Sequence, residues 1–412
     1  MKPFSYQPAD ALYLWYLRDP GHPVLVGTLS LVLTGTRGVS LRYAPSWRQT
    51  GFPLSEDLPL LDMEHLPAEK DRAAGAVDDA RPDRWGERVI RLLERPPRLS
   101  LLEMLYFAGD DRFGALGVST SAQAYEPHLR GPLPELGDID RVHELVRKVL
   151  AGEPVPQAAR RLITPGATMG GACPKALIET EGAQWVLKFS EDAGSSEPLI
   201  EHAAMTLAAR AGITVAQTRP VPLARGAAVL VKRFDRLPGT RVHALSANVA
   251  LRAAGVEMSY PELAQLLRRR GPTAGHRNRL QMRELFRRLV FNILMDNTDD
   301  HEKNHALLVS ETQQYELAPA FDVLPTGQAL GYQSMIVGDS GAESSIDNAL
   351  STCRAYWLSR QEATEQVHQV AAVVNTWRDH FKTCGVPRKL IDQYADQIDR
   401  PLLLQQRRQF SG

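Results

Sequence analysis

The sequence predicts an α+β fold with two or three domains. The chain has 412 residues, which is too many for one ordinary hydrophobic core. Its first part contains short apolar segments separated by glycine and proline turns, a pattern typical of β-strands. Beyond residue 236, the apolar residues recur at helical spacing instead.

The composition excludes several classes of protein. Hydrophobic residues make up 43% and charged residues 23%, the proportions of a soluble globular protein. Lysine and arginine total 48 residues, and aspartate and glutamate also total 48. The chain therefore lacks the basic excess that would indicate nucleic-acid binding without a partner, although the composition does not exclude a local basic patch. The three cysteines are far apart and lack metal-ligand spacing, which favours a reducing cytoplasm. No signal core or membrane-length apolar run is present, so we expect a cytoplasmic protein without a membrane anchor.

Residues 1–125 are expected to form a small α+β domain. Apolar runs bounded by turns predict its strands, and apolar residues at helical spacing predict its helices. The expected strands are 11–17, 24–33 and 39–43, the expected helices are 83–93 and 101–107, and 109–117 is a turn into another strand. Taken alone, this pattern indicates a packing domain without chemistry. A proline-rich link, roughly residues 126–137, closes the region.

A glycine-rich segment from Thr164 to Lys175 lies between a predicted helix over 138–160 and a predicted strand over 176–180. Three glycines in so short a loop can hold a phosphate group with backbone amides. The segment matches neither a Walker A loop nor the G-x-G-x-x-G loop of protein kinases. An ordinary structural turn is therefore the alternative.

Lys188 lies within an otherwise apolar predicted strand over 184–190. A lysine buried there would need an anionic partner, whereas lysines near strand ends often extend into solvent. In protein kinases, a strand lysine of this kind contacts nucleotide phosphates and a helix glutamate. Glu201, near the start of a predicted helix over 197–211, suits that second role. Its alternative is an ordinary acid that interacts with the helix dipole.

The segment from Ala227 to Arg236 is an apolar strand that becomes charged at its end. One interpretation is a strand that simply leaves a core. In a kinase it would instead be the hinge between two lobes, where backbone groups contact adenine. Under that interpretation the backbone from Val231 to Phe234 meets the base and the Phe234 ring packs on it. Asp235 is expected to be structural.

Six consecutive polar residues, Asp296 to His301, follow a predicted helix over 280–295 that has one apolar face. A solvated surface loop is one interpretation. The spacing favours another. Four residues separate Asp299 from Asn304, which is the spacing of the catalytic loop of protein kinases. In that loop the aspartate accepts the proton of the substrate hydroxyl, and the asparagine holds a metal.

A second lone acid, Asp322, follows a predicted strand over 305–309 and a segment over 315–321. Mg²⁺ prefers a few oxygen ligands together with phosphate oxygens, so Asn304 and Asp322 would suffice to hold it. Asp300 is the nearest competitor for the catalytic base. It lies one residue too close to Asn304 for the kinase spacing.

The remainder is predicted to be mainly helical. A helix is expected over 260–269, and Ser359 with Glu362 forms a capping box at the start of another. A buried helical stripe then contains Val367, Val370, Val374 and Trp377. Residues 324–347 are rich in glycine and serine and lack periodicity, which suits a mobile segment.

The segment from Thr298 to Asn304, followed by Ala320-Phe-Asp322, resembles the catalytic and metal loops of the HipA-like serine/threonine kinases. These are the kinase components of HipBA-type toxin–antitoxin systems. The resemblance covers nearly the whole chain, including Pro82–Gly86, Gly109–Leu116 and Arg233–Arg236. In the family, the first two of these segments lie in an N-terminal subdomain and have no catalytic role.

The resemblance implies a protein-kinase-like two-lobed fold that follows a small α+β subdomain. We expect the N-terminal subdomain over 1–125, a small β-rich N-lobe over 138–235 and a helical C-lobe over 236–412. It also implies ATP and Mg²⁺ as cofactors, because the family's catalytic and metal loops act on a nucleotide.

The resemblance also carries site residues onto this chain. The expected catalytic residues are Asp299, Lys188, Asn304 and His301, and the expected metal ligands are Asn304 and Asp322. The expected ATP-binding residues are Thr168, Gly170, Gly171, Lys175, Lys188, Val231, Arg233 and Phe234. Glu201 would form a structural ion pair, and Thr168 would be autophosphorylated. Many family members have Asp-Gly-His where this chain has Asp299-Asp300-His301, so the number of Mg²⁺ ions stays open.

The function implied by the resemblance is an ATP-dependent protein serine/threonine kinase. Its target would be a bacterial protein such as an aminoacyl-tRNA synthetase. Its partner would be a small helix-turn-helix antitoxin. The chain would contact DNA only indirectly, through that antitoxin.

Two alternatives stay open. A kinase of similar fold that acts on a small molecule would share the catalytic spacing, although the N-terminal subdomain and the Arg233–Arg236 tetrad argue against it. A non-catalytic binding or repressor module on a kinase scaffold is the other. The presence of all the expected polar residues argues against that module.

Overall fold

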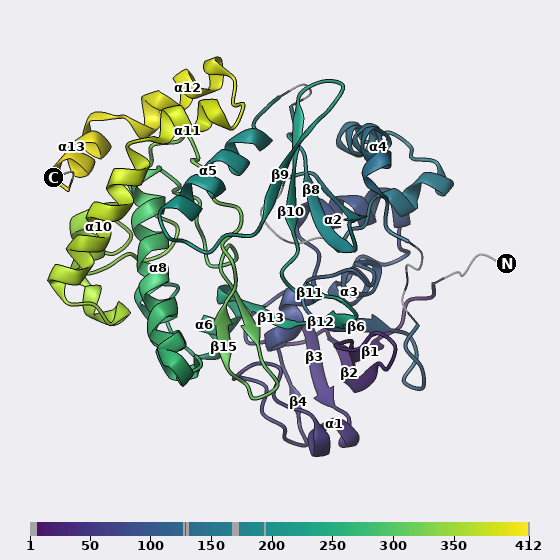
Figure 1. Cartoon of the computed structure of the whole chain (residues 1–412). Coiled ribbons are helices and arrows are strands. Elements are labelled where there is room, and N and C mark those ends of the chain that lie inside the picture. Colours follow the sequence, from purple (N-terminus) through teal and green to yellow (C-terminus); the bar gives the residue numbers. More distant parts are fainter. Residues whose placement is uncertain (1–5, 127, 129–131, 167–172, 193–194, 411–412) are drawn as a thin grey trace. The chain divides into compact units, whose positions relative to one another are not determined.

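The computed structural model of the chain describes residues 6–126, 128, 132–166, 173–192 and 195–410. Helices and sheets occur together, which confirms the predicted α+β class (Figure 1). The chain forms two compact units: unit 1 comprises Met1–Glu191 and Arg233–Leu245, and unit 2 comprises Asp192–Lys232 and Ser246–Gly412. Both units draw on the segment expected to form an N-lobe, so they do not follow the three predicted domains one to one.

A six-stranded sheet lies in the first part of unit 1. Its strand order is β4-β3-β2-β1-β6, with β5 paired to β3. Every pairing is antiparallel except that of β3 with β5. The strands are β1 (Ala11–Tyr16), β2 (Val24–Val32), β3 (Gly38–Tyr43), β4 (Glu64–His65), β5 (Arg72–Ala73) and β6 (Leu116–Ser119). The first three agree closely with the prediction because glycine and proline turns mark their ends.

The helices of unit 1 are α1 (Pro45–Thr50), α2 (Arg84–Val89), α3 (Leu101–Phe107) and α4 (Ile139–Ala151), with short 3-10 turns at Gly75–Ala80, Leu136–Asp138 and Gln157–Leu162. Two of these helices pack against the sheet: α1 contacts β2, and α3 contacts β2, β3 and β6. A π-helix, η2 (Ile90–Glu94), continues α2, so the predicted helix over 83–93 changes its winding halfway. The predicted helix over 138–160 is shorter than expected. It ends at left-handed Gly152, the usual C-terminal signal, and prolines follow.

A β-hairpin ends the first segment of unit 1. Strands β7 (Lys175–Thr180) and β8 (Ala183–Lys188) pair antiparallel, with Lys175 opposite Lys188. The two turn residues, Glu181 and Gly182, both have positive φ (54° and 69°), as a tight type I′ hairpin turn requires. All four residues from Trp185 to Lys188 are buried, so both faces of β8 are covered.

Residues 233–245 belong to unit 1 because their side chains bind its loop at 109–114. Asp235 is fully buried and accepts hydrogen bonds from Arg233 (2.7 and 2.9 Å), Arg236 (2.9 Å) and the Gly114 amide (2.8 Å). Burial alone would raise the pKa of Asp235, but these partners outweigh it and the pKa is lowered. The structural role predicted for Asp235 is confirmed. The segment also contains β11 (Arg236–Leu237), β12 (Thr240–Arg241) and most of β13 (His243–Ser246).

Unit 2 is mainly helical. Its helices are α5 (Pro198–Arg210), α6 (Ala247–Ala253), α7 (Tyr260–Arg270), α8 (Arg277–Leu294), α9 (Ile346–Ser351), α10 (Arg360–Val374), α11 (Trp377–Thr383), α12 (Arg388–Ile398) and α13 (Pro401–Gln409). Short 3-10 turns span Ala274–His276 and Cys353–Tyr356. Two antiparallel hairpins complete the unit: β9 (Thr218–Pro222) with β10 (Ala227–Lys232), and β14 (Ala306–Val309) with β15 (Tyr315–Leu317).

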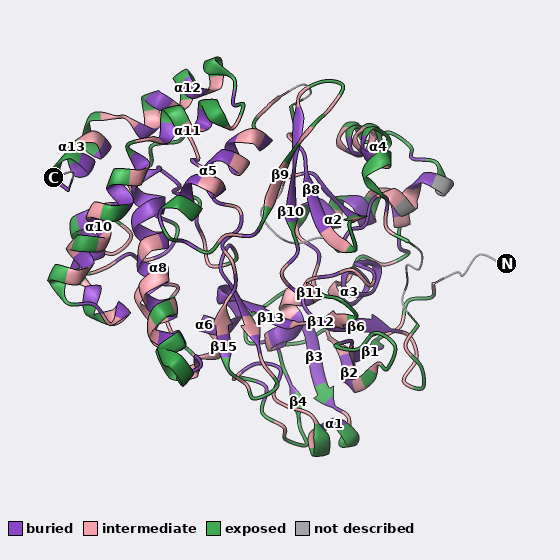
Figure 2. Ribbon diagram, in the orientation of Figure 1, coloured by how far each residue is buried: buried purple, intermediate pink, exposed green. Residues whose placement is uncertain are grey.

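Helix α8 is the central element of unit 2. It packs against α7, α9, α10 and α13. Its N-terminal end is exposed, and the half that leads to Leu294 is buried (Figure 2). The predicted apolar face of this helix is therefore a true core face.

Two predictions in the C-terminal part need correction. The capping box of Ser359 and Glu362 is present at the start of α10, but Trp377 begins α11 instead of continuing the α10 stripe. Residues 324–345 contain only isolated bridges, as the lack of periodicity suggested, yet Met335 and Val337 are completely buried. This segment is packed, so its interpretation as mobile is wrong. No helix in the described part of the chain is both long enough and apolar enough to cross a bilayer.

Candidate active site

The candidate site is built on the segment that follows α8, Asp296–His305, which we call the polar loop. Of its first six residues, Asp296, Asn297, Thr298 and Asp300 are buried, His301 is half-buried and only Asp299 is exposed. A solvated surface loop would show the opposite pattern, so that alternative is wrong. The sequence places polar groups inside unit 2, and their hydrogen bonds fix the course of the loop.

The beginning of the polar loop is held by an ion pair. Asp296 is fully buried and adopts a left-handed backbone (φ 55°), a strained conformation for a residue other than glycine. Its carboxylate lies 2.5 Å from the Arg400 guanidinium and accepts a hydrogen bond from the Ala329 amide (3.2 Å). These contacts come from distant parts of the chain and hold the strained turn in place.

Asp300 is the centre of a buried hydrogen-bond network. Its Oδ2 accepts hydrogen bonds from the Tyr260 hydroxyl and from His305 Nε2 (2.7 Å). Asn292 in turn donates to the Tyr260 oxygen (3.3 Å). Burial alone would raise the pKa of Asp300, but His305 and the two hydrogen bonds outweigh it and the pKa is lowered. Asp300 is thus fixed in the interior, which removes it as a competitor for the catalytic base.

The end of the polar loop is fastened to the start of α6. The Ala247 amide donates to the His305 carbonyl (2.8 Å), and the Asn248 amide donates to the Glu302 carbonyl (3.2 Å). The Asn248 side chain also donates to the Glu302 carboxylate (2.6 Å). Backbone and side-chain contacts therefore hold the polar loop at both ends.

Asp299 has the environment of a usable base. Its side chain is exposed, while both sequence neighbours are buried. Partial burial raises the pKa of Asp299; His301 opposes this shift, and the negative charges of Asp322 and Asp300 add to it. A raised pKa strengthens a carboxylate as a proton acceptor, which is what a general base requires.

Asn304 fits the predicted metal site. Its side chain is buried, and its Nδ2 is 3.4 Å from the Asp299 carbonyl, a weak hydrogen bond. The buried Oδ1 of Asn304 has no hydrogen-bond partner within the described residues. A buried amide oxygen without a partner is unfavourable unless something else binds it, and a hard cation is one such group.

Asp322 lies close enough to Asp299 for its charge to affect that carboxyl group. Its backbone is left-handed (φ 58°), and the segment before it is fixed by pairing, since Ala320 exchanges backbone hydrogen bonds of 2.8 Å with Thr214 and Ala216. Within the described residues, no three histidine, cysteine, aspartate or glutamate side chains form a metal-binding cluster. A metal at Asn304 and Asp322 would therefore depend on further oxygen atoms from a phosphate group or water, as Mg²⁺ commonly does.

The predicted lysines both lie in the β7–β8 hairpin of unit 1. Lys188 is only 2% exposed, so its interpretation as a surface lysine is wrong. Lys175 is completely buried and forms an ion pair with Asp83 at the start of α2. Lys175 was expected in the glycine-rich loop but is the first residue of β7. Thr168, Gly170 and Gly171 lie outside the described residues.

The predicted hinge residues divide into two kinds. Val231 is fully buried in β10, and Phe234 is half-buried with its ring edge-on to Phe113 (6.3 Å between centroids). The Arg233 guanidinium is held by Asp235 and by carbonyls of the 109–114 loop, so any contact of Arg233 with a nucleotide would have to use its backbone.

Glu201 lies in the first turn of α5 in unit 2 and is only 5% exposed. Burying a carboxylate removes it from water, and this cost is larger than the stabilisation that a helix dipole gives to an exposed acid. Its ion-pair role stays a prediction.

Sequence reasoning missed the residues that hold the polar loop: Tyr260, Asn292, His305 and Arg400. Asn292 carried a signal, because it is a polar residue between Phe291 and Ile293 in a strongly apolar stretch. Tyr260 and Arg400 carried none, since their partners Asp300 and Asp296 lie far away in the sequence. His305 lies only five residues after Asp300, but it was assigned to the following strand.

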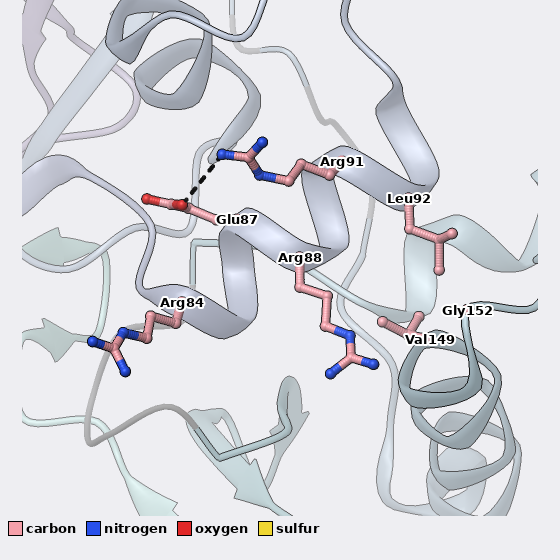
Figure 3. Close-up of a pocket in the computed structure, with 7 residues that line it drawn as sticks. All are labelled: Arg84, Glu87, Arg88, Arg91, Leu92, Val149 and Gly152. Carbon is pink, nitrogen blue, oxygen red and sulfur yellow. Dashed lines mark ion pairs between the residues drawn. The ribbon is translucent and has the colours of Figure 1, made fainter.

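A surface pocket of unit 1 lies away from these residues. It has a volume of about 420 Å³ and is lined by Arg84, Glu87, Arg88, Arg91, Leu92, Val149 and Gly152 (Figure 3). None of the predicted site residues lines it. A smaller internal void of about 10 Å³ in unit 2 is lined by Asp300, Asn304 and His305 among others, directly beneath the polar loop.

Comparison with known families gives two matches along the chain. Residues 22–119 match the HipA N-terminal domain family, and residues 167–377, more than half of the chain, match the HipA-like C-terminal domain family. A curated protein of Sinorhizobium fredii (strain NBRC 101917 / NGR234), "Putative kinase Y4dM", is 29% identical over 245 residues. The match covers 56% of this chain and 56% of that relative, so the chain spans just over half of the relative's length.

Two solved structures are also similar. The first is described as the Shewanella oneidensis MR-1 toxin–antitoxin system HipA, HipB and its operator DNA complex; its TM-score is 0.65, its identity is 18%, and 97% of each chain is covered. At this identity the match shows the fold, and it confirms the predicted kinase-like fold. The second, the Helicobacter pylori proinflammatory kinase CtkA, covers 61% of this chain and 96% of its own at 14% identity, and its TM-score of 0.37 is too low to support a conclusion.

Proposed function

Because the chain belongs to the HipA-like kinase family, we propose that it is an ATP-dependent protein serine/threonine kinase that uses Mg²⁺. The family supports kinase activity and the use of a nucleotide. The choice of a protein hydroxyl as acceptor is part of the proposal.

One observation carries the proposal: two adjacent aspartates of the polar loop have opposite environments. Asp300 is buried and hydrogen-bonded, whereas Asp299 is exposed and the pKa of its carboxyl group is raised. The catalytic loop of a kinase needs this division, because one group must fix the loop and another must reach the substrate.

Asp299 would orient the substrate hydroxyl and accept its proton late in the transfer. Asn304 and Asp322 would hold Mg²⁺, which supplies charge neutralisation at the phosphates when bound. The partnerless buried Oδ1 of Asn304, within the described residues, supports this role. His301, whose Nδ1 accepts a hydrogen bond from the Lys303 amide (3.3 Å), would remain beside Asp299 and moderate its pKa.

Lys188 would contact the α- and β-phosphates of ATP, with Glu201 as its structural partner. Both side chains are buried, and because an isolated buried charge is strongly unfavourable, each needs an oppositely charged group. Backbone groups from Val231 to Phe234 would meet the adenine base. Thr168, Gly170, Gly171 and Lys175 would complete the phosphate site, and Thr168 would be the site of autophosphorylation.

The partners belong to the same proposal. The solved neighbour is described as a complex of HipA with HipB and operator DNA. This supports a small helix-turn-helix antitoxin as the partner of the present chain, with DNA contacted only through that antitoxin. We propose a cytoplasmic bacterial protein, for example an aminoacyl-tRNA synthetase, as the target. Co-purification with the product of the neighbouring reading frame tests the antitoxin.

Transfer from radiolabelled ATP tests the proposed activity. The purified chain is incubated with Mg²⁺ and labelled ATP, alone and with a bacterial lysate, beside Asp299→Ala and the matched control Asp392→Ala, which removes an exposed carboxylate from α12. We expect label to appear on the chain itself or on a lysate protein. This label should be lost in Asp299→Ala and retained in Asp392→Ala.

Two other results would contradict the proposal. Label that appears only on an added small molecule, such as an aminoglycoside or a sugar, would indicate a small-molecule kinase. Absence of transfer, together with no rise in melting temperature when ATP and Mg²⁺ are added, would indicate a non-catalytic module, since ligand binding should stabilise the fold by about 3 kcal/mol at 100-fold excess over Kd.

A further inference from the structure

The segment Pro82–Gly86 has no part in the proposed chemistry, yet it holds the ends of the glycine-rich segment. Asp83 caps the N-terminus of α2, and its Oδ1 accepts a hydrogen bond from the Gly86 amide (2.8 Å). This fixes the side chain of Asp83 and the backbone of Gly86 relative to one another. Both residues then contact the glycine-rich segment, as does Trp85 between them.

The C-terminal end of the glycine-rich segment is held at Lys175. The Lys175 ammonium donates to Oδ2 of Asp83, and the Lys175 carbonyl accepts a hydrogen bond from Trp85 Nε1 (2.8 Å). Lys175 is completely buried and Trp85 is 2% exposed, so the Trp85 contact is shielded from water, whereas the Asp83 side chain is partly exposed. The side chain of Lys175 is thus fixed by the N-cap residue of α2, and its main chain by Trp85 in the first turn of that helix.

The N-terminal end is held at Pro165 and Gly166 by close backbone approach. A Cβ atom on Gly86 would lie 2.0 Å from the Pro165 carbonyl oxygen, so only glycine fits there. A Cβ atom on Gly166 would lie 2.5 Å from the Ala108 carbonyl oxygen. Gly86, 79 positions earlier in the chain, therefore sets the position of Pro165, and the turn after α3 sets that of Gly166.

The ion pair of Asp83 also concerns Lys188. Lys175 and Lys188 are directly opposed in the antiparallel pair of β7 and β8, so their side chains leave the hairpin on the same face. Two like charges in this arrangement repel one another, more strongly when both are buried. Asp83 supplies a negative charge to Lys175 and reduces that repulsion.

We infer that Asp83 and Trp85 are positioning residues for the nucleotide: by fixing Lys175 they hold the C-terminal end of the proposed phosphate-binding segment and set the charge beside Lys188. This rests on the proposed use of ATP. The N-terminal region of the chain then has a role in nucleotide affinity, which its predicted function as a packing domain without chemistry did not include. The chemical step itself, at Asp299, does not depend on these contacts.

Asp83→Asn is the principal test, because it keeps the size of the side chain and its Oδ1 while removing the charge opposite Lys175. We expect KM for ATP to rise about 10-fold or more, as is typical when a residue that orients a binding group is lost, with kcat at saturating ATP changed less than about threefold. Asp83→Glu, which restores the carboxylate, should recover most of the affinity. Trp85→Phe removes the indole donor together with one ring of this buried side chain, and it provides a second variant should Asp83→Asn fold poorly.

Asp78→Asn is the matched control. Asp78 is a largely buried carboxylate of the same region, with ion pairs to Arg72 and Arg81 (both 2.9 Å), and none of these contacts reaches the glycine-rich segment. It should lower the melting temperature without raising KM for ATP. Equal rises of KM in Asp78→Asn and Asp83→Asn would overturn the inference, because they would indicate general destabilisation. An unchanged KM in Asp83→Asn would overturn it as well.

Hydrogen exchange of the nucleotide-free protein provides a readout that needs no activity. Backbone amides at 164–166 and 175–180 should exchange faster in Asp83→Asn than in the wild type, and at the wild-type rate in Asp78→Asn. If the wild type neither binds nor uses ATP, the proposed function fails. In that case, unchanged exchange in Asp83→Asn would also refute the claim that Asp83 fixes the backbone at 164–166 and 175–180. Faster exchange would support that claim.

Discussion

Asp299 and Asp300 are adjacent in sequence, and the structure predicts opposite consequences when each is replaced by alanine. Asp299 is exposed and is the proposed base, whereas Asp300 is buried among Tyr260 and His305. Asp299→Ala should therefore remove the chemistry and spare the fold. Asp300→Ala should weaken the fold first.

The magnitude for Asp300→Ala follows from the groups left behind. The Tyr260 hydroxyl and the His305 ring would lose their acceptor, and a buried polar group without a partner costs about 1–3 kcal/mol. Summed over these two groups, we expect a loss of about 2–6 kcal/mol, a large share of the roughly 5–15 kcal/mol by which domains are stable.

Asp299→Ala should change stability by no more than about 0.5 kcal/mol, because exposed side chains outside special contacts contribute little. General-base catalysis contributes roughly 10²- to 10⁴-fold, so kcat should fall by that factor, equivalent to about 3–5 kcal/mol of activation free energy. Binding of a nucleotide analogue should remain close to that of the wild type.

The assay combines urea unfolding with phosphate transfer at saturating ATP, using the same preparations of wild type and both variants. If the free energy of unfolding of Asp300→Ala equals that of the wild type, the buried network does not contribute substantially to the stability of the fold. Loss of nucleotide binding in Asp299→Ala would show that the role given to Asp299 is wrong.

Four further predictions follow from the site and the fold. Lys188→Ala should weaken ATP binding measured by calorimetry, and an unchanged Kd would remove the lysine from the phosphate site. Thr168→Ala should abolish autophosphorylation detected by mass spectrometry, and label elsewhere would move that site. Asn304→Ala should raise the Mg²⁺ concentration needed for half-maximal transfer while leaving the melting temperature nearly unchanged; an unaltered Mg²⁺ requirement would exclude it as a ligand. Burial lowers the pKa of His243 from 6.5 to about 4, so the neutral ring contributes its full stability above pH 6.5 and loses about 3 kcal/mol of it as the pH falls to about 4. Melting temperatures of wild type and His243→Gln across that range test this, and parallel curves would contradict it.

Much of the fold could be predicted from local sequence because local signals decided it. The strands β1, β2 and β3 lie between glycine and proline turns, and the capping box at Ser359 begins α10. Where tertiary contacts decided the structure, local signals failed. The segment 233–245 joins unit 1 because Asp235 and its arginines bind a loop more than a hundred residues earlier.

The candidate site shows the same division. The kinase-loop spacing pointed to Asp299 and Asn304, and Asp322 was chosen as a lone acid after a strand. Their roles stay predictions. Spacing could not show which of two adjacent acids is accessible, because Tyr260, forty residues earlier, determines that. Nor could it show that Lys175 pairs with Asp83, ninety-two residues before it.

The interleaved course of the chain has a consequence for its synthesis. The chain leaves unit 1 at Glu191 and returns to it only at Arg233, after the first segment of unit 2 has been made. A nascent chain that has emerged only to residue 191 lacks Asp235, so the Gly114 amide still lacks its native acceptor. Unit 1 can therefore reach its final state only once residue 245 has left the ribosome. A truncated protein intended to contain this unit alone would need the distant segment joined to it.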